Sequence, residues 1–271
     1  MPVIFYSTVD PASMNIAKAL KENFGFVKAT EIEWGEKILP VWHKHATQLV
    51  ELNSPLIEVD FLKHFFKSDL FVFASKHKSA SENPCYTVHA TGNWGDEIKY
   101  GGNARELQLT SAKALQTFFD LLKEKENNGT KKVMPVFREA THHGPTSLKT
   151  PAVFVELGSS ERQWNDFELA IPIAEVIVEG CKAYSHKSVK AALGFGGTHY
   201  LAAFENLPFA FSHVASKHVM DFVDAGMVRQ AKEKTVEPIE MAFVDWKGCT
   251  KEQREKLIPA LEENGLKWEK V

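Results

Sequence analysis

The sequence predicts a single α/β domain with a mostly parallel or mixed central sheet flanked by helices. Short apolar runs rich in β-branched and aromatic residues alternate along the chain with longer segments of helical period, as in strands joined by helices. The chain has 271 residues, of which 44% are hydrophobic and 25% charged, which is enough for one large core without disulfides. We expect residues 1–271 to form one domain, with residues 26–60 as an insertion or small lobe.

Strands are predicted wherever a short apolar run is bounded by polar or turn-forming residues. Leu70–Ser75 is nearly continuous in apolar residues, which is typical of a strand buried on both faces. In chain order, the predicted strands are Val3–Ser7, Val27–Trp34, Ile38–Trp42, Leu56–Val59, Leu70–Ser75, Cys85–Ala90, Val133–Phe137, Ala152–Leu157, Ala191–Phe195 and Ile239–Trp246.

Helices are predicted where apolar residues recur every three or four positions. Asn103–Lys125 has the clearest pattern, and Ser13 is a suitable N-cap for the first helix. Pro172 lies in the first turns of one helix or marks a kink in it. The predicted helices are Ser13–Asn23, Asn103–Lys125, Phe167–Tyr184, Phe211–Val228 and Thr250–Asn264.

Composition excludes several classes of protein. The cysteines Cys85, Cys181 and Cys249 are odd in number and form no CxxC pair, which argues against a disulfide scaffold or a zinc ribbon. The N-terminus does not have the pattern of a signal peptide, and no apolar segment is long enough to cross a bilayer. We therefore expect a soluble, cytoplasmic protein that functions as a monomer.

The net charge of −3, from 32 basic and 35 acidic residues, does not by itself favour nucleic-acid binding. An RNA partner would need a local basic patch, although an ordinary solvated face is the better interpretation of any one of the lysine groups. The candidates for such a patch are Lys76, Lys78, Lys131, Lys132, Lys182, Lys187 and Lys190.

Polar and glycine-rich segments follow several of the predicted strands. In an open α/β sheet, ligands bind at the carboxyl ends of the strands, so these segments predict a shared crevice. His142 and His143 are adjacent, and successive side chains of a strand point to opposite faces, so one of them should lie in a turn with its imidazole free. We expect convergence in this crevice of His77, His89, His142, His143, Glu156 and His199.

The segment Gly196-Gly197-Thr198-His199 combines unobstructed backbone N–H groups with an imidazole. That combination suits an oxyanion or phosphate site beside a general base, and it equally suits a tight turn after a strand. Glu156 could orient a histidine, bind a metal or cap the next helix. His213 is a further candidate to enter the crevice, from a strand or loop.

The sequence contains no HExxH, CxxC, GxSxG, Walker A or GxGxxG motif. The zincin, α/β-hydrolase, P-loop and dinucleotide-binding classes are therefore excluded in their usual forms. The residues alone predict a histidine-rich, hydrolase-like crevice whose nucleophile is unspecified.

The segments around these strand ends resemble the D-aminoacyl-tRNA deacylase family of archaea and plants. The most specific pair is Thr-His-His-Gly-Pro-Thr at 141–146 followed by Gly-Gly-Thr-His-Tyr at 196–200, and the likeness covers essentially the whole chain. The resemblance implies an esterase that removes D-amino acids from the terminal ribose of tRNA, with zinc as cofactor. It also implies a fold akin to peptidyl-tRNA hydrolase and to phosphorylase-like α/β proteins.

The resemblance implies that five residues of this chain are catalytic residues or zinc ligands: His89, His142, His143, Glu156 and His199. The proposed substrate contacts are Trp94, which could stack on the terminal adenosine, and Lys76, Gly196, Gly197 and Thr198. Rival hypotheses are a peptidyl-tRNA hydrolase or metal-dependent amidohydrolase on the same fold. A rival of another class is a non-catalytic RNA- or nucleotide-binding module with structural histidines.

Overall fold

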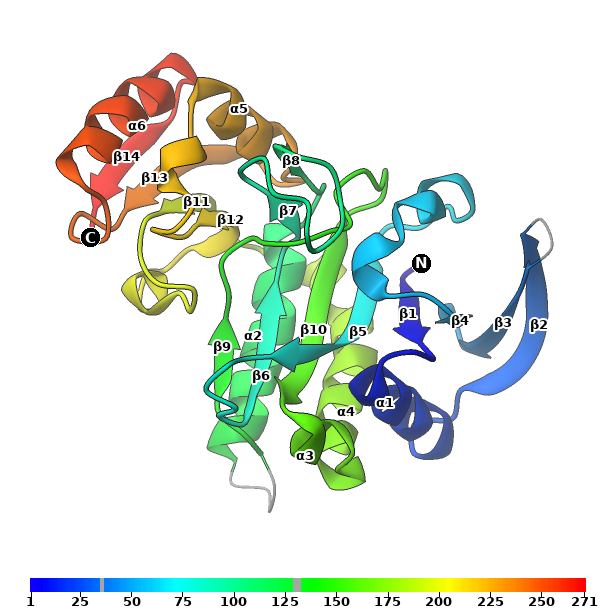
Figure 1. Ribbon diagram of the computed structural model, residues 1–271. Coiled ribbons are helices and arrows are strands. Elements are labelled where there is room, and N and C mark those ends of the chain that lie inside the picture. Colours follow the sequence, from blue (N-terminus) through cyan, green and yellow to red (C-terminus); the bar gives the residue numbers. More distant parts are fainter. Residues whose placement is uncertain (35–36, 129–132) are drawn as a thin grey trace.

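A mixed sheet forms the centre of the protein in the computed structural model, which describes residues 1–34, 37–128 and 133–271 (Figure 1). Its strand order is β2-β3-β4-β1-β5-β10-β6-β9. The strands are β1 (Val3–Ser7), β2 (Val27–Trp34), β3 (Lys37–Lys44), β4 (Thr47–Leu52), β5 (Phe71–Lys78), β6 (Cys85–His89), β9 (Val136–Arg138) and β10 (Ala152–Ser159). The predicted α/β class with a mixed sheet is confirmed. Lys131 and Lys132, considered above for a basic patch, lie outside the described residues.

The central strands β1, β5 and β10 run parallel, whereas β6 is antiparallel to β10. All eight residues of β10 are buried, as expected for a strand covered on both faces. The strands β2, β3 and β4 continue the sheet beyond β1 with antiparallel pairing between them, and β4 pairs parallel with β1.

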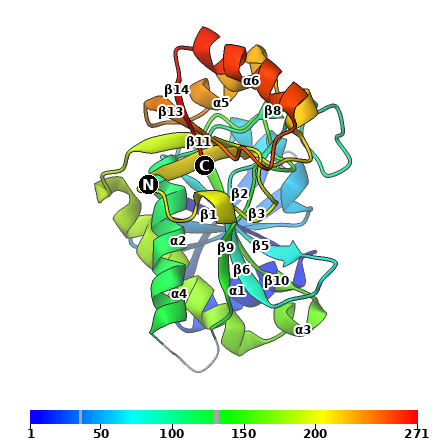
Figure 2. The same ribbon diagram turned by 90° about the vertical axis from the view of Figure 1, so that its left-hand side faces the viewer.

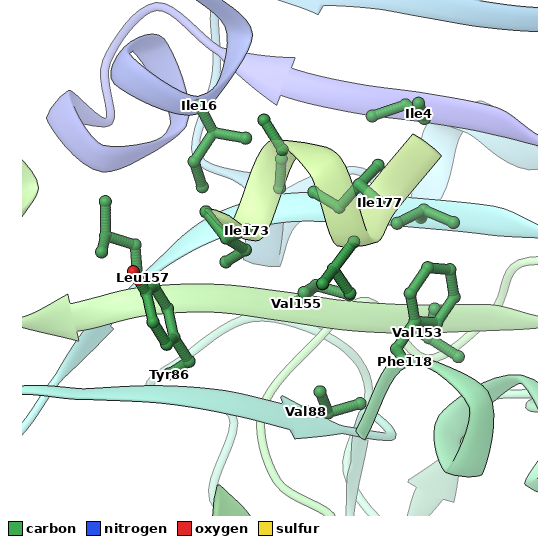
Figure 3. Packing of buried hydrophobic residues seen from close by; sticks show 14 of the residues in the cluster. Ile4, Ile16, Tyr86, Val88, Phe118, Val153, Val155, Leu157, Ile173 and Ile177 are labelled. Atoms are coloured by element: carbon green, nitrogen blue, oxygen red, sulfur yellow. The ribbon is translucent and has the colours of Figure 1, made fainter. Parts of the chain in front are cut away.

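One face of the sheet is covered by α1 (Pro11–Glu22), α2 (Ala112–Asn127) and α4 (Phe167–Ala183). Figure 2 shows α2 and α4 side by side on this face. Beneath them, Val153, Val155 and Leu157 of β10 belong to the same buried cluster as Ile173 and Ile177 of α4 (Figure 3). The alternate residues of β10 therefore point to the other face of the sheet.

The other face of the sheet is partly covered by two short 3₁₀ segments, η1 (Leu56–Glu58) and η2 (Asp60–His64). Their core includes Phe73 and Phe154, whose rings stack with centroids 4.7 Å apart. The next position on this face of β10 is Glu156, so the apolar surface gives way to polar groups there.

A second, fully parallel sheet lies at one end of the first (Figure 1), with the order β12-β11-β13-β14. Its elements are β11 (Ala191–Phe195), β12 (Ala210–Ala215), α5 (Ala225–Glu233), β13 (Ile239–Val244), α6 (Lys251–Glu263) and β14 (Lys267–Lys270). The sequence predicted β11 and β13 but neither β12 nor β14, and it did not predict a separate sheet. The remaining short elements are β7 (Gly92–Asn93), β8 (Glu106–Leu107), α3 (Glu161–Trp164), η3 (Tyr184–His186), η4 (Ala202–Phe204) and η5 (Met220–Phe222).

Two predicted helix starts are wrong because stronger caps lie elsewhere. Asp10, not Ser13, caps α1: its carboxylate accepts a hydrogen bond from the Ser13 N–H at 3.0 Å, and Pro11 is favoured in the first turn. Helix α2 begins at Ala112 after the N-cap Ser111, not at Asn103.

Two further predictions missed the type of element. Residues 211–215 belong to β12, and α5 begins only at Ala225, so the helix predicted at Phe211–Val228 is largely wrong. The strand predicted at Leu56–Val59 is the 3₁₀ segment η1, and the strand of that region is β4. None of the helices in the described ranges is long and apolar enough to cross a membrane.

The contact between α2 and α4 gives a test of the packing. A Cβ added at Gly180 would lie 2.2 Å from the ring of Phe118, which is fully buried. Overpacking of this kind costs up to about 3 kcal/mol, more than the gain of about 1 kcal/mol in helix propensity. We predict that Gly180→Ala lowers the free energy of unfolding, measured by chemical denaturation, whereas Lys182→Ala at an exposed position of α4 changes it little. A Gly180→Ala variant as stable as the parent would contradict this packing.

Candidate functional site

A cluster of histidines and carboxylates lies on the sheet face that the three helices leave uncovered. It contains every residue that the sequence predicted to converge, and it also contains Glu139. We call this set the histidine–carboxylate cluster, and its members are His77, His89, Glu139, His142, His143, Glu156 and His199. The predicted convergence of these side chains is therefore confirmed, but they do not meet at one edge of the sheet, because β6 and β9 run antiparallel to β10.

Strand alternation places three members of the cluster on one face. Glu156 of β10 pairs with Ser75 of β5, two residues before His77, and His89 of β6 pairs with Phe154 of β10. Gly158 makes room for His77, because a Cβ at this position would lie 2.6 Å from the His77 Cβ. The predicted role of Glu156 as a helix cap does not apply, since its carboxylate contacts Thr87, His77 and His89.

The loop after β9 and the loop after β11 bring in the other members. The Ala140 N–H donates to the His199 carbonyl at 2.8 Å, which fixes the two loops side by side. The Gly92 N–H donates to the His143 carbonyl at 2.7 Å. His143 has a φ of +48°, so the chain turns there as predicted for one of the adjacent histidines.

The ring nitrogens of three histidines are oriented by backbone carbonyls. Nδ1 of His89, His142 and His143 lies 3.1, 2.8 and 2.6 Å from the carbonyl oxygens of Ala90, Ala140 and Gly144. When Nδ1–H donates to these carbonyls, the lone pair of the neutral ring is on Nε2. Histidines that bind metal ions are commonly fixed by this kind of backbone hydrogen bond.

The two carboxylates hold the remaining histidines. Nδ1 of His77 lies 3.4 Å from Glu139 and 3.6 Å from Glu156, and Nε2 of His77 lies 3.0 Å from the hydroxyl of Tyr200. Nε2 of His199 lies 2.8 Å from Oε1 of Glu139. Both oxygens of Glu139 are nevertheless buried without a well-aligned hydrogen bond within the described chain, as is Nε2 of His89.

The pKa of each histidine follows from its neighbours. Burial lowers the pKa of His142 well below its usual range and that of His143 to about 4, and the positive charge of His89 adds to both shifts. Burial also acts to lower the pKa of His77 and of His89, but contacts with neighbouring groups outweigh it, and both pKa values are raised. For His77 these contacts are hydrogen bonds to Cys85, Glu139 and Glu156, and for His89 the main one is the negative charge of Glu156.

The carboxylates show the opposite balance. Burial raises the pKa of a carboxylate, but contacts with His199 and His77 hold the pKa of Glu139 well below its usual range. Burial also acts to raise the pKa of Glu156, but its contacts with His89 and His77 lower that pKa overall. Two ionised carboxylates therefore lie beside protonated His77 and His89 when no other cation is bound, while His142 and His143 are neutral.

Sets of three side chains in the cluster could hold a metal ion, with one ligand atom from each residue within 4.8 Å of the others. The described sets are His89 with His142 and His143, Glu139 with His142 and His199, and His77 with Glu139 and Glu156. Catalytic zinc sites commonly use three protein ligands of these types. The orphaned atoms of His89 and Glu139 fit a cation better than they fit a closed hydrogen-bond network.

The proposed base-stacking role of Trp94 does not fit the structure. Its side chain is only 2% exposed and packs in the core of the second sheet, where its ring lies 6.2 Å from that of Phe195. Trp94 is therefore a core residue of the second sheet.

Two other predicted substrate contacts point elsewhere. Lys76 alternates with His77 on β5, and its ammonium lies 5.6 Å from the ring of Trp164, away from the cluster. The Gly196 N–H donates to the Ala215 carbonyl at 2.8 Å, so it is not free to stabilise an oxyanion.

The glycine segment acts instead as a tight turn that presents His199. Gly196 and Gly197 have φ values of +85° and +80°, and a Cβ at Gly196 would lie 2.6 Å from Sγ of Cys249. The hydroxyl of Thr198 is exposed and donates to the Tyr200 carbonyl at 2.6 Å. His213 is outside the cluster, fully buried on β12 at 3.3 Å from the Thr141 hydroxyl.

Glu139 is the main site residue that the sequence analysis did not single out. It immediately precedes the Ala-Thr-His-His segment at the end of β9, and a carboxylate at a strand end was the available signal. Its contact with His199 depends on the bridge between Glu139 and Tyr200, which joins the two loops. Local sequence does not encode that pairing.

The fold and the cluster together define an α/β protein with an enzyme-like buried centre of histidines and carboxylates. The model of the D-aminoacyl-tRNA deacylase family matches residues 64–269. D-Aminoacyl-tRNA deacylases from Pyrococcus abyssi and Methanocaldococcus jannaschii are 36% and 30% identical to this chain, each over 99% of both chains. This chain belongs to the D-aminoacyl-tRNA deacylase family, and the resemblance seen in its motifs is confirmed.

A solved structure is similar over the whole chain. The crystal structure of AF0625, a conserved protein of unknown function, has a TM-score of 0.87 and 26% sequence identity, and the match covers 100% of this chain and 95% of that one. The architecture of both sheets is therefore shared with a solved structure.

The electrostatics of the cluster can be measured directly. We predict that His143 in the metal-free protein takes up a proton only near pH 4, because burial and the charge of His89 both disfavour its imidazolium. His89→Ala should raise this pKa. Imidazole nitrogen shifts followed by NMR from neutral to acidic pH report both values, and a parent His143 that titrates near the usual 6.5 would show that the ring is solvated.

Proposed function

We propose that this chain hydrolyses the ester bond between a D-amino acid and the 3′-terminal ribose of tRNA, and that it does so in the cytoplasm, where tRNA is charged. The observation that carries the proposal is the set of oriented imidazoles beside two buried carboxylates, in a chain related to named deacylases over almost its full length. Ester hydrolysis needs a group that takes a proton from water and returns it to the leaving oxygen.

His199 is the residue best placed for that proton transfer. Its side chain is 42% exposed, so water and substrate reach it, while Glu139 lies 2.8 Å from its Nε2. With Nε2–H directed at Glu139, the lone pair of the neutral ring is on Nδ1. We assign His199 as the general base towards water and as the acid that protonates the ribose oxygen, with Glu139 as the residue that orients it.

The proposed cofactor is zinc, held by Nε2 of His89, His142 and His143. It would supply Lewis-acid polarisation of the ester carbonyl. The low pKa of His142 and His143 keeps both imidazoles in the neutral form that binds metal ions. Glu156 lies 3.4 Å from Nε2 of His89 and offsets the positive charge of the ion.

The proposal is tested by hydrolysis of matched D- and L-aminoacyl-tRNA. We predict turnover of the D-ester in preference to the L-ester, and a loss in kcat/KM of about 100-fold or more for His142→Ala, His143→Ala and His199→Ala. His43 and His186 lie outside the cluster, so the control variants His43→Ala and His186→Ala should have the kcat/KM of the parent. Hydrolysis of peptidyl-tRNA, measured in parallel, tests the rival hypothesis that the protein is a peptidyl-tRNA hydrolase.

Two results would contradict the proposal. One is full activity of all three cluster variants with native circular dichroism, which would make the histidines structural. The other is turnover of peptidyl-tRNA with no turnover of D-aminoacyl-tRNA.

A further inference from the structure

The loop between β7 and β8 exposes apolar residues near the histidine–carboxylate cluster. Ile98 and Tyr100 are 57% and 58% exposed. Large apolar side chains exposed so close together often mark a binding site. The ammonium of Lys99 lies 5.3 Å from the centroid of the Tyr100 ring. No other aromatic ring in the described part of the chain stacks on it.

This loop is firmly attached beside His143. The Gly144 N–H donates to the Tyr100 carbonyl at 3.0 Å, and Gly144 directly follows His143. Gly101 and Gly102 both have φ of +76°, and a Cβ at Gly101 would lie 2.0 Å from the Ile57 carbonyl oxygen. The loop therefore has a fixed conformation, in which the backbone of Tyr100 is hydrogen-bonded to the residue that follows His143.

The side chain of Asn93 supports the same path. Its amide donates to the carbonyls of Gly101 and Asn103, at 2.9 and 3.1 Å. An aromatic ring on a braced loop loses little conformational entropy when a ligand stacks on it.

We propose that Tyr100 stacks on the terminal base of the tRNA 3′ end, the role that the sequence suggested for the buried Trp94. The inference rests on the proposed function, because in that substrate the reacting ester is on the ribose of this last nucleotide. A base bound beside His143 places the attached ribose at the cluster. Unpaired RNA bases are commonly bound by exposed aromatic rings.

Two observations favour base stacking over other uses of this surface. Asp96 and Glu97 in the same loop are exposed and acidic, so they disfavour a phosphate contact. Another exposed aromatic ring, that of Trp246, already has partners: it stacks on Trp268 at 6.3 Å between centroids, and the guanidinium of Arg254 lies 4.5 Å from its centroid.

The test uses uncharged RNA, so that it does not depend on catalysis. A hairpin with the acceptor stem of tRNA carries 2-aminopurine in place of the terminal adenine, and stacking quenches its fluorescence. We expect quenching with the parent and with Tyr100→Phe, which keeps the ring. Tyr100→Leu should lose the quenching and bind about 10- to 100-fold more weakly. Trp246→Leu is the control, and it should behave like the parent.

A kinetic measurement complements the binding assay. With D-aminoacyl-tRNA, Tyr100→Leu should raise KM and leave kcat nearly unchanged, because stacking contributes to the ground state and the transition state alike. Unchanged quenching with Tyr100→Leu, or its loss only with Trp246→Leu, would overturn the inference. A parent that quenches normally but hydrolyses no D-ester would instead count against the proposed function and leave this site standing.

Discussion

The burial of two carboxylates beside one another is the constraint on which the rest of the site depends. Glu139 and Glu156 are each almost fully buried, and an uncompensated buried charge costs several kcal/mol. Three imidazoles contact them: His77 contacts both, His89 contacts Glu156 and His199 contacts Glu139. The Thr87 hydroxyl also donates to Glu156. The cluster is therefore an arrangement that requires a positive charge, carried either by protons on His77 and His89 or by a bound cation.

The same constraint explains why the protein needs both of its sheets. His77, His89 and Glu156 come from the first sheet, whereas His199 follows the first strand of the second. The bridge between Glu139 and Tyr200 joins the two, and Tyr200 reaches back to His77. His199, the proposed general base, is exposed on one side and contacts the buried carboxylate of Glu139 on the other, as proton transfer to and from an ester would require.

Sequence alone predicted the parts of this site that depend on local pattern. Apolar runs ending in polar residues located His89, Glu156 and the His142–His143 pair. These residues do not meet at one edge as expected, because β6 and β9 run antiparallel to β10. Sequence alone misassigned Lys76, because adjacent side chains of a strand point to opposite faces and His77 occupies the cluster face. It misassigned Trp94, because burial depends on packing with the second sheet. Glu139 depends on the pairing of loops distant in sequence, which no local pattern records.

Calorimetry of zinc binding to the metal-free protein tests most directly the proposal that the cluster exchanges protons for a metal ion. Titrations in buffers of different ionisation enthalpy count the protons released. We predict tight binding with net proton release, because zinc displaces the proton that His89 shares with Glu156. Glu156→Gln should weaken binding by about 10- to 100-fold. Absence of zinc binding, or binding without proton release, would contradict the account.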